Sequence, residues 1–391
     1  GRAEGQDGAE GQCDRARGQP EPLRIGRTHA AKAYFGSPTW RGERGLARLS
    51  CGQMSVLIGS HEAFFSHDTG RHHPERPGRL EAVRRGVAAS GVAGDVAGFE
   101  PREATDEELG RVHDAGYALA VRDFCAGGGG FLDQDTIASP GSFDAALRAA
   151  GAGPDAAERL RAGAAVAAFL ALRPPGHHAR PGRAMGFCLF NNVAVTAATL
   201  AAAGERVAVV DWDAHHGNGT QEIFYARGDV LYVSIHQFPC YPGTGSLAET
   251  GTGPGAGATV NLPLPAGSAG DAYREAIDTV VTPLVERFEP AWVLVSAGFD
   301  GHRDDPLTDL GLSAGDYADL TALTVRLAPP GRRIVFLEGG YDLAALEAST
   351  AATVAALDGE RLLPEAATSA GTAAASAARA VAAARRLYLG S

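Results

Sequence analysis

Cysteine and long hydrophobic runs are both scarce in this sequence. Its five cysteines are scattered through 391 residues and form no Cys-x-x-Cys pair, so the sequence predicts neither a disulfide framework nor a zinc site built from thiolates. The most apolar segment begins at Ala162 and is too short and too rich in alanine to span a bilayer. We therefore expect no membrane contact and a reducing, cytoplasmic location.

Basic residues are outnumbered, with 35 Lys and Arg against 46 Asp and Glu and a formal net charge of −11. This excess of negative charge disfavours direct binding of nucleic acid and suits a cationic partner such as a lysine-rich tail. The hydrophobic content of 45% is sufficient for a large buried core. The sequence gives no indication of the oligomeric state.

The two ends of the chain differ in composition from the middle. Residues 1–53 are rich in Gly, Arg, Glu and Gln with little apolar periodicity, which predicts a disordered or non-native leader. The pattern changes abruptly at Met54, where we expect translation to start. Residues 361–391 are low-complexity and rich in alanine, which predicts a surface helix or a partly disordered tail. Residues 54–360 are predicted to form one folded domain.

Short β-branched runs alternate with helical patterns between the two ends. This alternation predicts an α/β fold with a mostly parallel central sheet and helices on both faces. In such sheets ligands bind outside the carboxyl ends of the strands, so polar residues at those ends are candidates for a site. Strands are expected within 56–60, 206–213, 230–237, 259–265, 292–300 and 333–341, and helices within 76–90, 105–124, 142–151, 270–288 and 314–328.

Acidic and histidine side chains end one of these apolar runs. Asp211, Asp213 and His215 recur at every second position, so on an extended strand they would share one face. Burying these carboxylates without a cation would be costly, and Asp and His are good ligands for a divalent first-row metal. Asp300, at the end of another run, is the best candidate for a third ligand. The alternative is a solvated loop with an Asp–His hydrogen bond.

Two further strand ends carry residues suited to proton transfer and to hydrogen bonding. Pro174 to Gly176 stop a strand and deliver His177 and His178 to its end. An imidazole titrates near pH 6.5 and can accept and return a proton. Tyr341 follows two glycines and offers a phenol to a developing oxyanion. A His-His dipeptide is more often a surface feature, and a lone tyrosine is usually core, so the candidates rest on their joint position at strand ends.

From about Met54 to Leu357 the chain resembles the histone deacetylase superfamily, specifically the bacterial class II and histone deacetylase-like amidohydrolases. The motifs that carry this resemblance occur in the family's order: HHPERPGRL, RPPGHH, GFCLFNN, VDWDAHHGNGT, YPGTG, SAGFDGHRDDPL and LEGGY. The resemblance implies a single arginase/deacetylase-like catalytic domain over residues 54–360. It also implies a zinc enzyme that removes acetyl or other acyl groups from lysine side chains of proteins or peptides.

The resemblance assigns a role to each candidate. Asp213, His215 and Asp300 would bind one catalytic Zn²⁺, His178 would be the general base and acid, and Tyr341 would stabilise the oxyanion together with the metal. His177 would act mainly as an electrostatic stabiliser, backed by Asp211. Asp211 and Ser234, with backbone groups near Asp213, His215 and Ile235, would also hold a structural K⁺.

The resemblance further implies a narrow substrate tunnel. Phe187, preceded by Gly186, and Tyr241 would form its aromatic walls, which suit an apolar lysine stem, and Asp135 would hold the substrate backbone at the rim. Asn218 stands where class I relatives carry an aspartate behind the second histidine, so His178 is expected to be less basic here. Leu307 occupies the position where a dedicated polyamine deacetylase would present a glutamate.

Three alternatives remain open. In the first, the substrate would be an acetylated polyamine or another small acetylated amine. The enzyme would then hydrolyse acetylputrescine and acetylspermidine in preference to acetyl-lysine peptides. A non-catalytic module that binds acyl-lysine would be expected to lack the metal ligands or Tyr341, and neither is missing. An arginase-like enzyme with two manganese ions is disfavoured because few acidic ligands cluster. Iron or cobalt suits the same Asp-His-Asp ligands as zinc.

Overall fold

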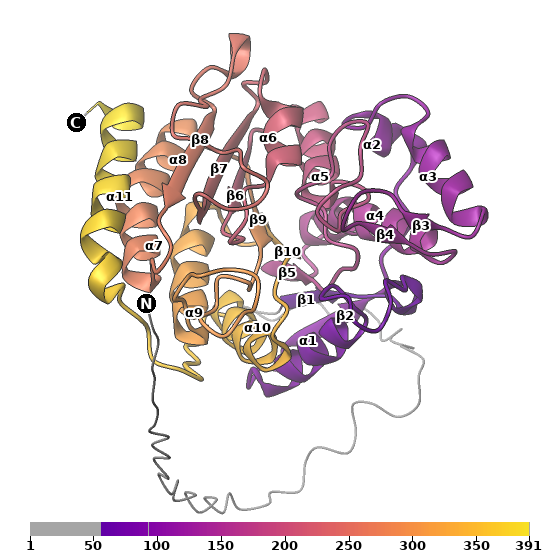
Figure 1. Ribbon diagram of the computed structural model, residues 1–391, viewed down its shortest axis with the longest axis horizontal. Coiled ribbons are helices and arrows are strands. Elements are labelled where there is room, and N and C mark those ends of the chain that lie inside the picture. Colours follow the sequence, from indigo (N-terminus) through magenta and orange to yellow (C-terminus); the bar gives the residue numbers. More distant parts are fainter. Residues whose placement is uncertain (1–55, 93, 391) are drawn as a thin grey trace, which may run out of the picture. The chain divides into compact units, whose positions relative to one another are not determined.

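A parallel sheet of eight strands forms the centre of the fold in the computed structural model, which describes residues 56–92 and 94–390 (Figure 1). The predicted leader, residues 1–53, and the expected start at Met54 lie outside the described residues. All neighbouring strands of the sheet run parallel. Across the sheet the order is β2 (Val96–Phe99), β1 (Val56–Gly59), β5 (Ala167–Leu170), β10 (Arg333–Leu337), β9 (Trp292–Ala297), β6 (Val207–Asp211), β7 (Val230–Gln237) and β8 (Thr259–Leu264).

Helices cover both faces of the sheet, as the alternating sequence pattern predicts (Figure 1). On one face α4 packs against α5; on the other α1, α10, α9 and α7 pack in that order, and α11 packs against α7 and β8. Their bounds are α4 (Ser142–Arg161), α5 (Asn192–Ala202), α1 (Gly78–Ala89), α10 (Leu343–Leu357), α9 (Ala314–Thr324), α7 (Gly270–Ala276) and α11 (Ala374–Leu389). Shorter elements are α2 (Asp106–Gly110), α3 (Tyr117–Ala126), α6 (Asn218–Phe224), α8 (Thr282–Phe288) and the antiparallel pair β3 (Gly130–Phe131) and β4 (Ile137–Ala138).

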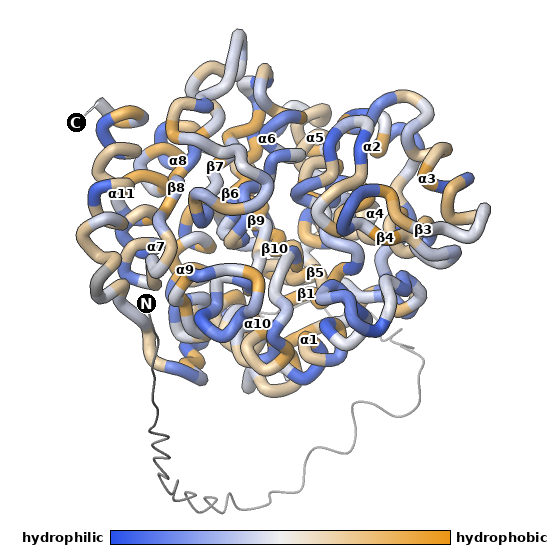
Figure 2. The backbone as a smooth tube through the Cα atoms, in the orientation of Figure 1, coloured by the Kyte–Doolittle hydropathy of each residue, from blue (hydrophilic) through white to orange (hydrophobic). Residues whose placement is uncertain are grey.

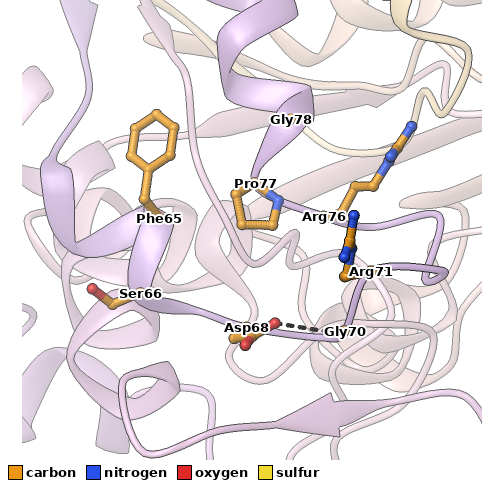
Figure 3. Close-up of a pocket in the computed structure, with 8 residues that line it drawn as sticks. All are labelled: Phe65, Ser66, Asp68, Gly70, Arg71, Arg76, Pro77 and Gly78. Atoms are coloured by element: carbon orange, nitrogen blue, oxygen red, sulfur yellow. Dashed lines mark hydrogen bonds between the residues drawn. The ribbon is translucent and has the colours of Figure 1, made fainter.

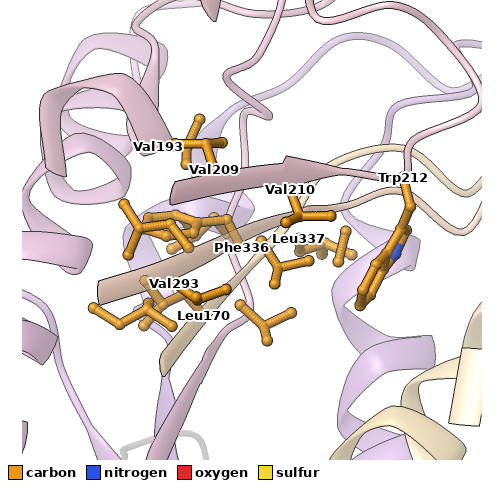
Figure 4. Close-up of a cluster of buried hydrophobic side chains, with 14 of the residues drawn as sticks. Leu170, Val193, Val209, Val210, Trp212, Val293, Phe336 and Leu337 are labelled. Atoms are coloured by element: carbon orange, nitrogen blue, oxygen red, sulfur yellow. The ribbon is translucent and has the colours of Figure 1, made fainter. Parts of the chain in front are cut away.

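The middle strands are buried along their whole length, because helices cover both of their faces. Their side chains, together with those of α5, form a close-packed apolar cluster beneath the carboxyl edge of the sheet (Figure 4). A rigid sheet of this kind holds the loops that follow its strands in fixed positions. Within the cluster each of the following is at most 1% exposed: Leu170, Val193, Val209, Val210, Trp212, Val293, Phe336 and Leu337.

The helix predictions were correct in type but wrong in several boundaries. The single helix expected over 105–124 is split into α2 and α3, because Gly116, with φ +85°, precedes α3 in the left-handed conformation. Conversely, α4 continues past the expected end at Gly151 and through Pro154 to Arg161. Tight packing explains this extension: a Cβ on Gly153 would lie 1.9 Å from the Thr196 hydroxyl of α5. The short strands β2, β3 and β4 were not predicted.

The alanine-rich C-terminal segment contains the helix α11. This helix has an amphipathic pattern, with hydrophobic and hydrophilic residues alternating along it (Figure 2), and it buries Ala377, Val381 and Ala384. The Tyr388 hydroxyl accepts a hydrogen bond from the Asn261 N–H (3.0 Å), which joins α11 to the edge strand β8. In the part of the chain that the structure describes, no helix combines the length and apolar character needed to cross a membrane.

Candidate active site

Four neighbouring strands carry the predicted site residues. In sheet order these strands are β5, β10, β9 and β6, and because they are parallel their carboxyl ends meet at one edge. The segments that follow them are distant in sequence but adjacent in space. These segments supply His177 and His178 after β5, Tyr341 after β10, Asp300 after β9, and Asp213 and His215 after β6.

The side chains of Asp213, His215 and Asp300 converge at this edge. Nδ1 of His215 lies 2.9 Å from Oδ2 of Asp300 and 3.2 Å from Oδ1 of Asp213, and one possible ligand atom of each residue lies within 4.8 Å of the others. Asp300 and Asp213 are 0% and 1% exposed, and His215 is 9% exposed. The alternative of a solvated Asp–His loop is therefore wrong.

The local geometry of the loop after β6 differs from the prediction. Asp211, Asp213 and His215 were expected on one strand, but β6 ends at Asp211. Oδ1 of Asp211 accepts the N–H of Asp213 (3.2 Å), and Oδ1 of Asp213 accepts the N–H of His215 (2.9 Å). Such bonds between an aspartate and the backbone two residues later turn the chain. The alternation of polar residues thus reflects successive turns rather than one face of a strand.

Backbone groups hold both carboxylates in place. Oδ1 of Asp300 accepts the N–H of Ala214 (3.0 Å), and Oδ2 of Asp213 accepts the N–H of Gly339 (2.8 Å). Glycine is required beside them: a Cβ on Gly298 would lie 2.0 Å from Oδ2 of Asp213, and one on Gly339 would lie 2.2 Å from Oδ2 of Asp300. The glycines of the SAGFD and LEGGY motifs therefore make room for the two carboxylates.

The cluster carries an excess of buried negative charge. No lysine or arginine among the described residues forms an ion pair with Asp213 or Asp300, whose only such partners are His177 and His215. Burial and the adjacent Asp213 carboxylate raise the pKa of Asp300. Burial alone would lower the pKa of His215, but the two carboxylates outweigh this effect and raise that pKa well above 6.5. A bound cation would relieve this excess of charge.

His177 is held by buried acidic groups. Its Nδ1 lies 3.1 Å from Oδ2 of Asp211, an oxygen that also accepts the Tyr232 hydroxyl (3.1 Å). Burial lowers the pKa of His177, but the charges of Asp213 and Asp211 offset this effect and raise the pKa to about 10. His177 is therefore positively charged at neutral pH in the protein without a bound metal.

His178 has the opposite protonation preference. Burial, together with the charges of His177 and His215, lowers its pKa well below 6.5. Its Nδ1 lies 2.8 Å from Oδ1 of Asn218, and because an amide oxygen only accepts, Nδ1 carries the proton. In the neutral ring Nε2 is then free to accept a proton. The His178 ring lies 4.0 Å from that of His177 and 6.1 Å from that of His215, measured between centroids.

The backbone around Tyr341 is fixed by two residues that the sequence reasoning missed. Oδ2 of Asp305 accepts the N–H of Tyr341 (2.7 Å), and Nε of Arg79 donates to the carbonyl of Gly340 (2.7 Å). The Arg79 guanidinium also lies 5.0 Å from the centre of the Tyr341 ring. Burial raises the pKa of Tyr341 well above 10, so its hydroxyl remains a hydrogen-bond donor.

Glu338 was also missed, although its position inside an apolar run was a signal. Its Oε2 accepts the N–H groups of Gly176 (2.7 Å) and His177 (3.2 Å), and Ser296 donates to Oε1 (3.1 Å). Burial raises its pKa to about 7. Glu338 thus links β10 and β9 to the segment that carries the paired histidines.

Aromatic rings flank the polar cluster. Phe187 contacts Tyr341 edge to face, with 5.8 Å between centroids, and Tyr241 lies 5.2 Å from the His178 ring. Both Gly186 (φ +56°) and Phe187 (φ +67°) have left-handed backbone conformations, which for Phe187 is strained. A Cβ on Gly186 would lie 2.4 Å from the His178 ring. Gly186 therefore allows the aromatic wall to approach the histidines.

The rim loop around Asp135 is tied to this wall. His73 packs edge to face on Phe187 at 4.6 Å, and its Nε2 lies 3.0 Å from the Asp135 carbonyl. The Thr136 hydroxyl donates to the Asp135 carboxylate (3.0 Å) and accepts the Phe187 N–H (3.1 Å). These contacts make His73 part of the rim. Leu307 is 39% exposed, on the loop after Asp300.

The residues predicted to hold a K⁺ ion lie within the sheet. Asp211 and Ser234 are paired in register on β6 and β7 and are fully buried. The Ser234 hydroxyl lies 2.9 Å from Nδ1 of His236, whose Nε2 lies 3.0 Å from the Gly245 carbonyl. Because that carbonyl only accepts, Nε2 carries the proton and Ser234 donates to Nδ1. The oxygen lone pairs of Ser234 then remain available to a cation.

His302 lies in a second group of possible metal ligands, with Asp304 and Glu365. Glu365 is already engaged, because it accepts from the Arg303 guanidinium, from Nε2 of His302 and from the Ala314 N–H. Its oxygens therefore have little capacity left for a metal. The three cysteines that the described residues include, Cys125, Cys188 and Cys240, are free.

Comparison with known proteins identifies the family of this chain. The chain is similar to a protein named probable deacetylase from Archaeoglobus fulgidus, with 41% identity over 313 residues that cover 78% of this chain and 87% of the relative. A histone deacetylase-like amidohydrolase from Pseudomonas aeruginosa is 41% identical over 298 residues, which cover 74% of this chain and 78% of that protein.

A solved structure is also similar. The crystal structure of the HDA15 HD domain matches with a TM-score of 0.80 and 38% identity, covering 86% of this chain and 96% of that one. The family profile of the histone deacetylase domain matches residues 73–357. The chain has the deacetylase-like fold and belongs to the histone deacetylase family, whose members are amidohydrolases.

Proposed function

We propose that this protein is a zinc-dependent deacylase that hydrolyses the side-chain amide of acylated lysine in proteins or peptides. One observation carries the proposal: Asp213, His215 and Asp300 converge in a buried cluster beside His178 and Tyr341. A module that only binds acyl-lysine has no use for buried acid and base groups in this arrangement, so catalysis is favoured over binding alone.

The residues present fit a zinc ion. Two carboxylates and one imidazole nitrogen form a three-ligand set of the kind found in catalytic zinc sites, which leave a further position open. The buried negative charge lacks a lysine or arginine partner among the residues described, and no thiol belongs to the set. When bound, zinc supplies Lewis-acid activation of water and of the amide carbonyl.

The chain's own side chains then have distinct tasks. His178, neutral and with Nε2 free, accepts the proton of the attacking water and returns it to the departing lysine amine. His177, held by Asp211, stabilises negative charge that develops nearby. The Tyr341 hydroxyl donates a hydrogen bond to the tetrahedral oxyanion. Phe187 and Tyr241 exclude water from the apolar stem of the substrate.

A potassium ion bound below the site is part of the proposal. Asp211 and Ser234 would hold it, with the Ile235 backbone, because both side chains are buried and Ser234 has free lone pairs. Burial raises the pKa of Asp211, so a monovalent cation would stabilise its ionised form.

Two substitutions and a substrate panel test the proposal. Tyr341→Phe removes one oxyanion donor and is expected to lower kcat about 10²- to 10³-fold, and Asp300→Ala is expected to abolish turnover. Acetyl-lysine peptides should be hydrolysed faster than acetylated putrescine or spermidine, and metal analysis of the same preparation should find one zinc per chain. Full activity in either variant would overturn the mechanism, and preference for the polyamines would make the small-amine alternative the correct one.

A further inference from the structure

A surface pocket of about 560 Å³ lies between the short helix η1 (Glu62–Ser66) and the start of α1 (Figure 3). Its chemistry is cationic on one side: Arg71 and Arg76 lie together there in the view of Figure 3, and the ring of Phe65 lies on the other. The residues that line it are Phe65, Ser66, Asp68, Gly70, Arg71, Arg76, Pro77 and Gly78.

The guanidinium groups of the two arginines lack a partner of opposite charge among the described residues. Both are exposed, and neither guanidinium forms an ion pair or hydrogen bond with another described residue. Asp68 is the one acidic residue of the lining, and its Oδ1 accepts the N–H of Gly70 (2.9 Å). Arginine forms two parallel hydrogen bonds with a carboxylate, so two guanidinium groups that line one pocket suit an acidic ligand. On a chain of net charge −11, this pocket is a local exception.

The arginines of the pocket lie close in the chain to His73, which contacts the aromatic wall. Arg71 and Arg76 bracket the segment that contains His73, whose ring packs on Phe187 and whose Nε2 contacts the Asp135 carbonyl. Two residues span at most about 7 Å, so the Cα of Arg71 lies within about 7 Å of that of His73. An extended peptide advances about 3.3 Å per residue. A side chain two to four residues from a lysine seated beside Phe187 therefore comes within reach of the arginines.

We propose that this pocket binds an acidic side chain of the substrate, two to four residues from the acylated lysine. The inference rests on the proposed function and narrows its substrate class to acyl-lysine segments that carry a nearby Asp or Glu. An acetylated polyamine has no carboxylate and bears positive charge, so the pocket repels it. The arginines act as specificity residues and leave the chemical step unchanged.

The test compares three substrates: an acetyl-lysine peptide with Glu at these positions, the same peptide with Gln, and a doubly capped acetyl-lysine without neighbours. The wild-type protein should show a higher kcat/KM for the Glu peptide than for the Gln peptide, by about fivefold, as two exposed ion pairs provide. The R71E/R76E variant should invert this preference. Its kcat/KM for capped acetyl-lysine should stay unchanged, and raised salt should weaken the wild-type preference.

A matched control separates local from global charge. R379E/R385E alters two exposed arginines of α11 and changes the net charge equally. This helix packs on the edge strand β8, whereas β1 lies next to the other edge of the sheet. Retention of the wild-type preference in this control supports the inference. Equal rates for the Glu and Gln peptides, or an equal effect of both double variants, would overturn the inference alone. Failure to hydrolyse any acyl-lysine substrate would overturn the proposed function and the inference with it.

Discussion

Replacing Gly339 with alanine is the sharpest test of the proposed metal site, because it adds a single methyl group where two of the proposed ligands meet. The new Cβ would lie 2.2 Å from Oδ2 of Asp300 and 2.7 Å from Oδ2 of Asp213. The first distance is about 1.2 Å shorter than the lower limit of ordinary contact, 3.4 Å. The backbone of Gly339 does not have a positive φ, so alanine adds no backbone strain there.

The carboxylates have little freedom to move away from that methyl group. Oδ1 of Asp300 is bound to the Ala214 N–H and Oδ1 of Asp213 to the His215 N–H, so a shift of either side chain breaks a buried hydrogen bond. Displacing groups that orient metal ligands typically costs 10- to 100-fold in metal affinity, which corresponds to about 1.4 to 2.8 kcal/mol. We expect Gly339→Ala to lose zinc affinity by this factor.

Zinc affinity is measured by competition with a chelating dye, and circular dichroism and thermal unfolding of the metal-free protein establish that the variant is folded. Gly298→Ala, which places a Cβ 2.0 Å from Oδ2 of Asp213, should behave in the same way. Gly78→Ala is the control, because its Cβ meets nothing nearer than 3.8 Å. Zinc affinity of a folded Gly339→Ala within twofold of wild type would refute the assignment of these ligands.

Three further predictions concern proton affinity and stability. Asn218→Asp places a charge beside His178, so we expect the acidic limb of the pH profile of kcat/KM to move upward by about one unit. Burial lowers the pKa of His113 from 6.5 to about 4. Between pH 6.5 and about 4 the unfolded chain therefore binds more protons than the folded one. The free energy of unfolding should fall with decreasing pH in this range, by at most about 1.4 kcal/mol per pH unit. In the neutral ring, Nε2 accepts the Asn191 N–H. Glutamine does not titrate, so His113→Gln should reduce the loss of unfolding free energy between pH 7 and 5. Tyr388→Phe leaves a backbone N–H of β8 without its acceptor and should lower the free energy of unfolding by about 1 kcal/mol in urea, with activity unchanged.

Each of these predictions has an outcome that contradicts it. An unmoved acidic limb in Asn218→Asp would mean that another group limits the rate at low pH. Parallel stability curves for His113→Gln and wild type would show that this ring does not titrate within the folded range. A Tyr388→Phe protein as stable as wild type would show that water replaces the phenol at the sheet edge.

The sequence was sufficient to predict the fold class and the convergence of Asp213, His215 and Asp300. Apolar runs that end in polar residues mark the carboxyl ends of parallel strands, and six of the eight strands of the sheet lie in the expected ranges. Boundaries were less predictable where packing overrides local preference. The helix α4 continues past its expected end at Gly151 and packs against α5 so closely that Gly153 has no room for a Cβ.

Supporting residues were harder to find. Arg79 and Asp305 fix the backbone around Tyr341 from segments far away in the chain, and no local periodicity marks such a contact. Glu338 had a recognisable signal, a single carboxylate in an apolar strand end, but its partner His177 depends on β5 and β10 being neighbours.

The sequence by itself determined which residue types would gather at the strand ends, because buried strands and their turns leave a local pattern of hydrophobicity. Only the tertiary structure decided the strand order β5-β10-β9-β6 and thereby which of those ends meet. Such juxtapositions arise from packing between distant segments, and the free energy that selects them depends on the whole core rather than on any short stretch of chain.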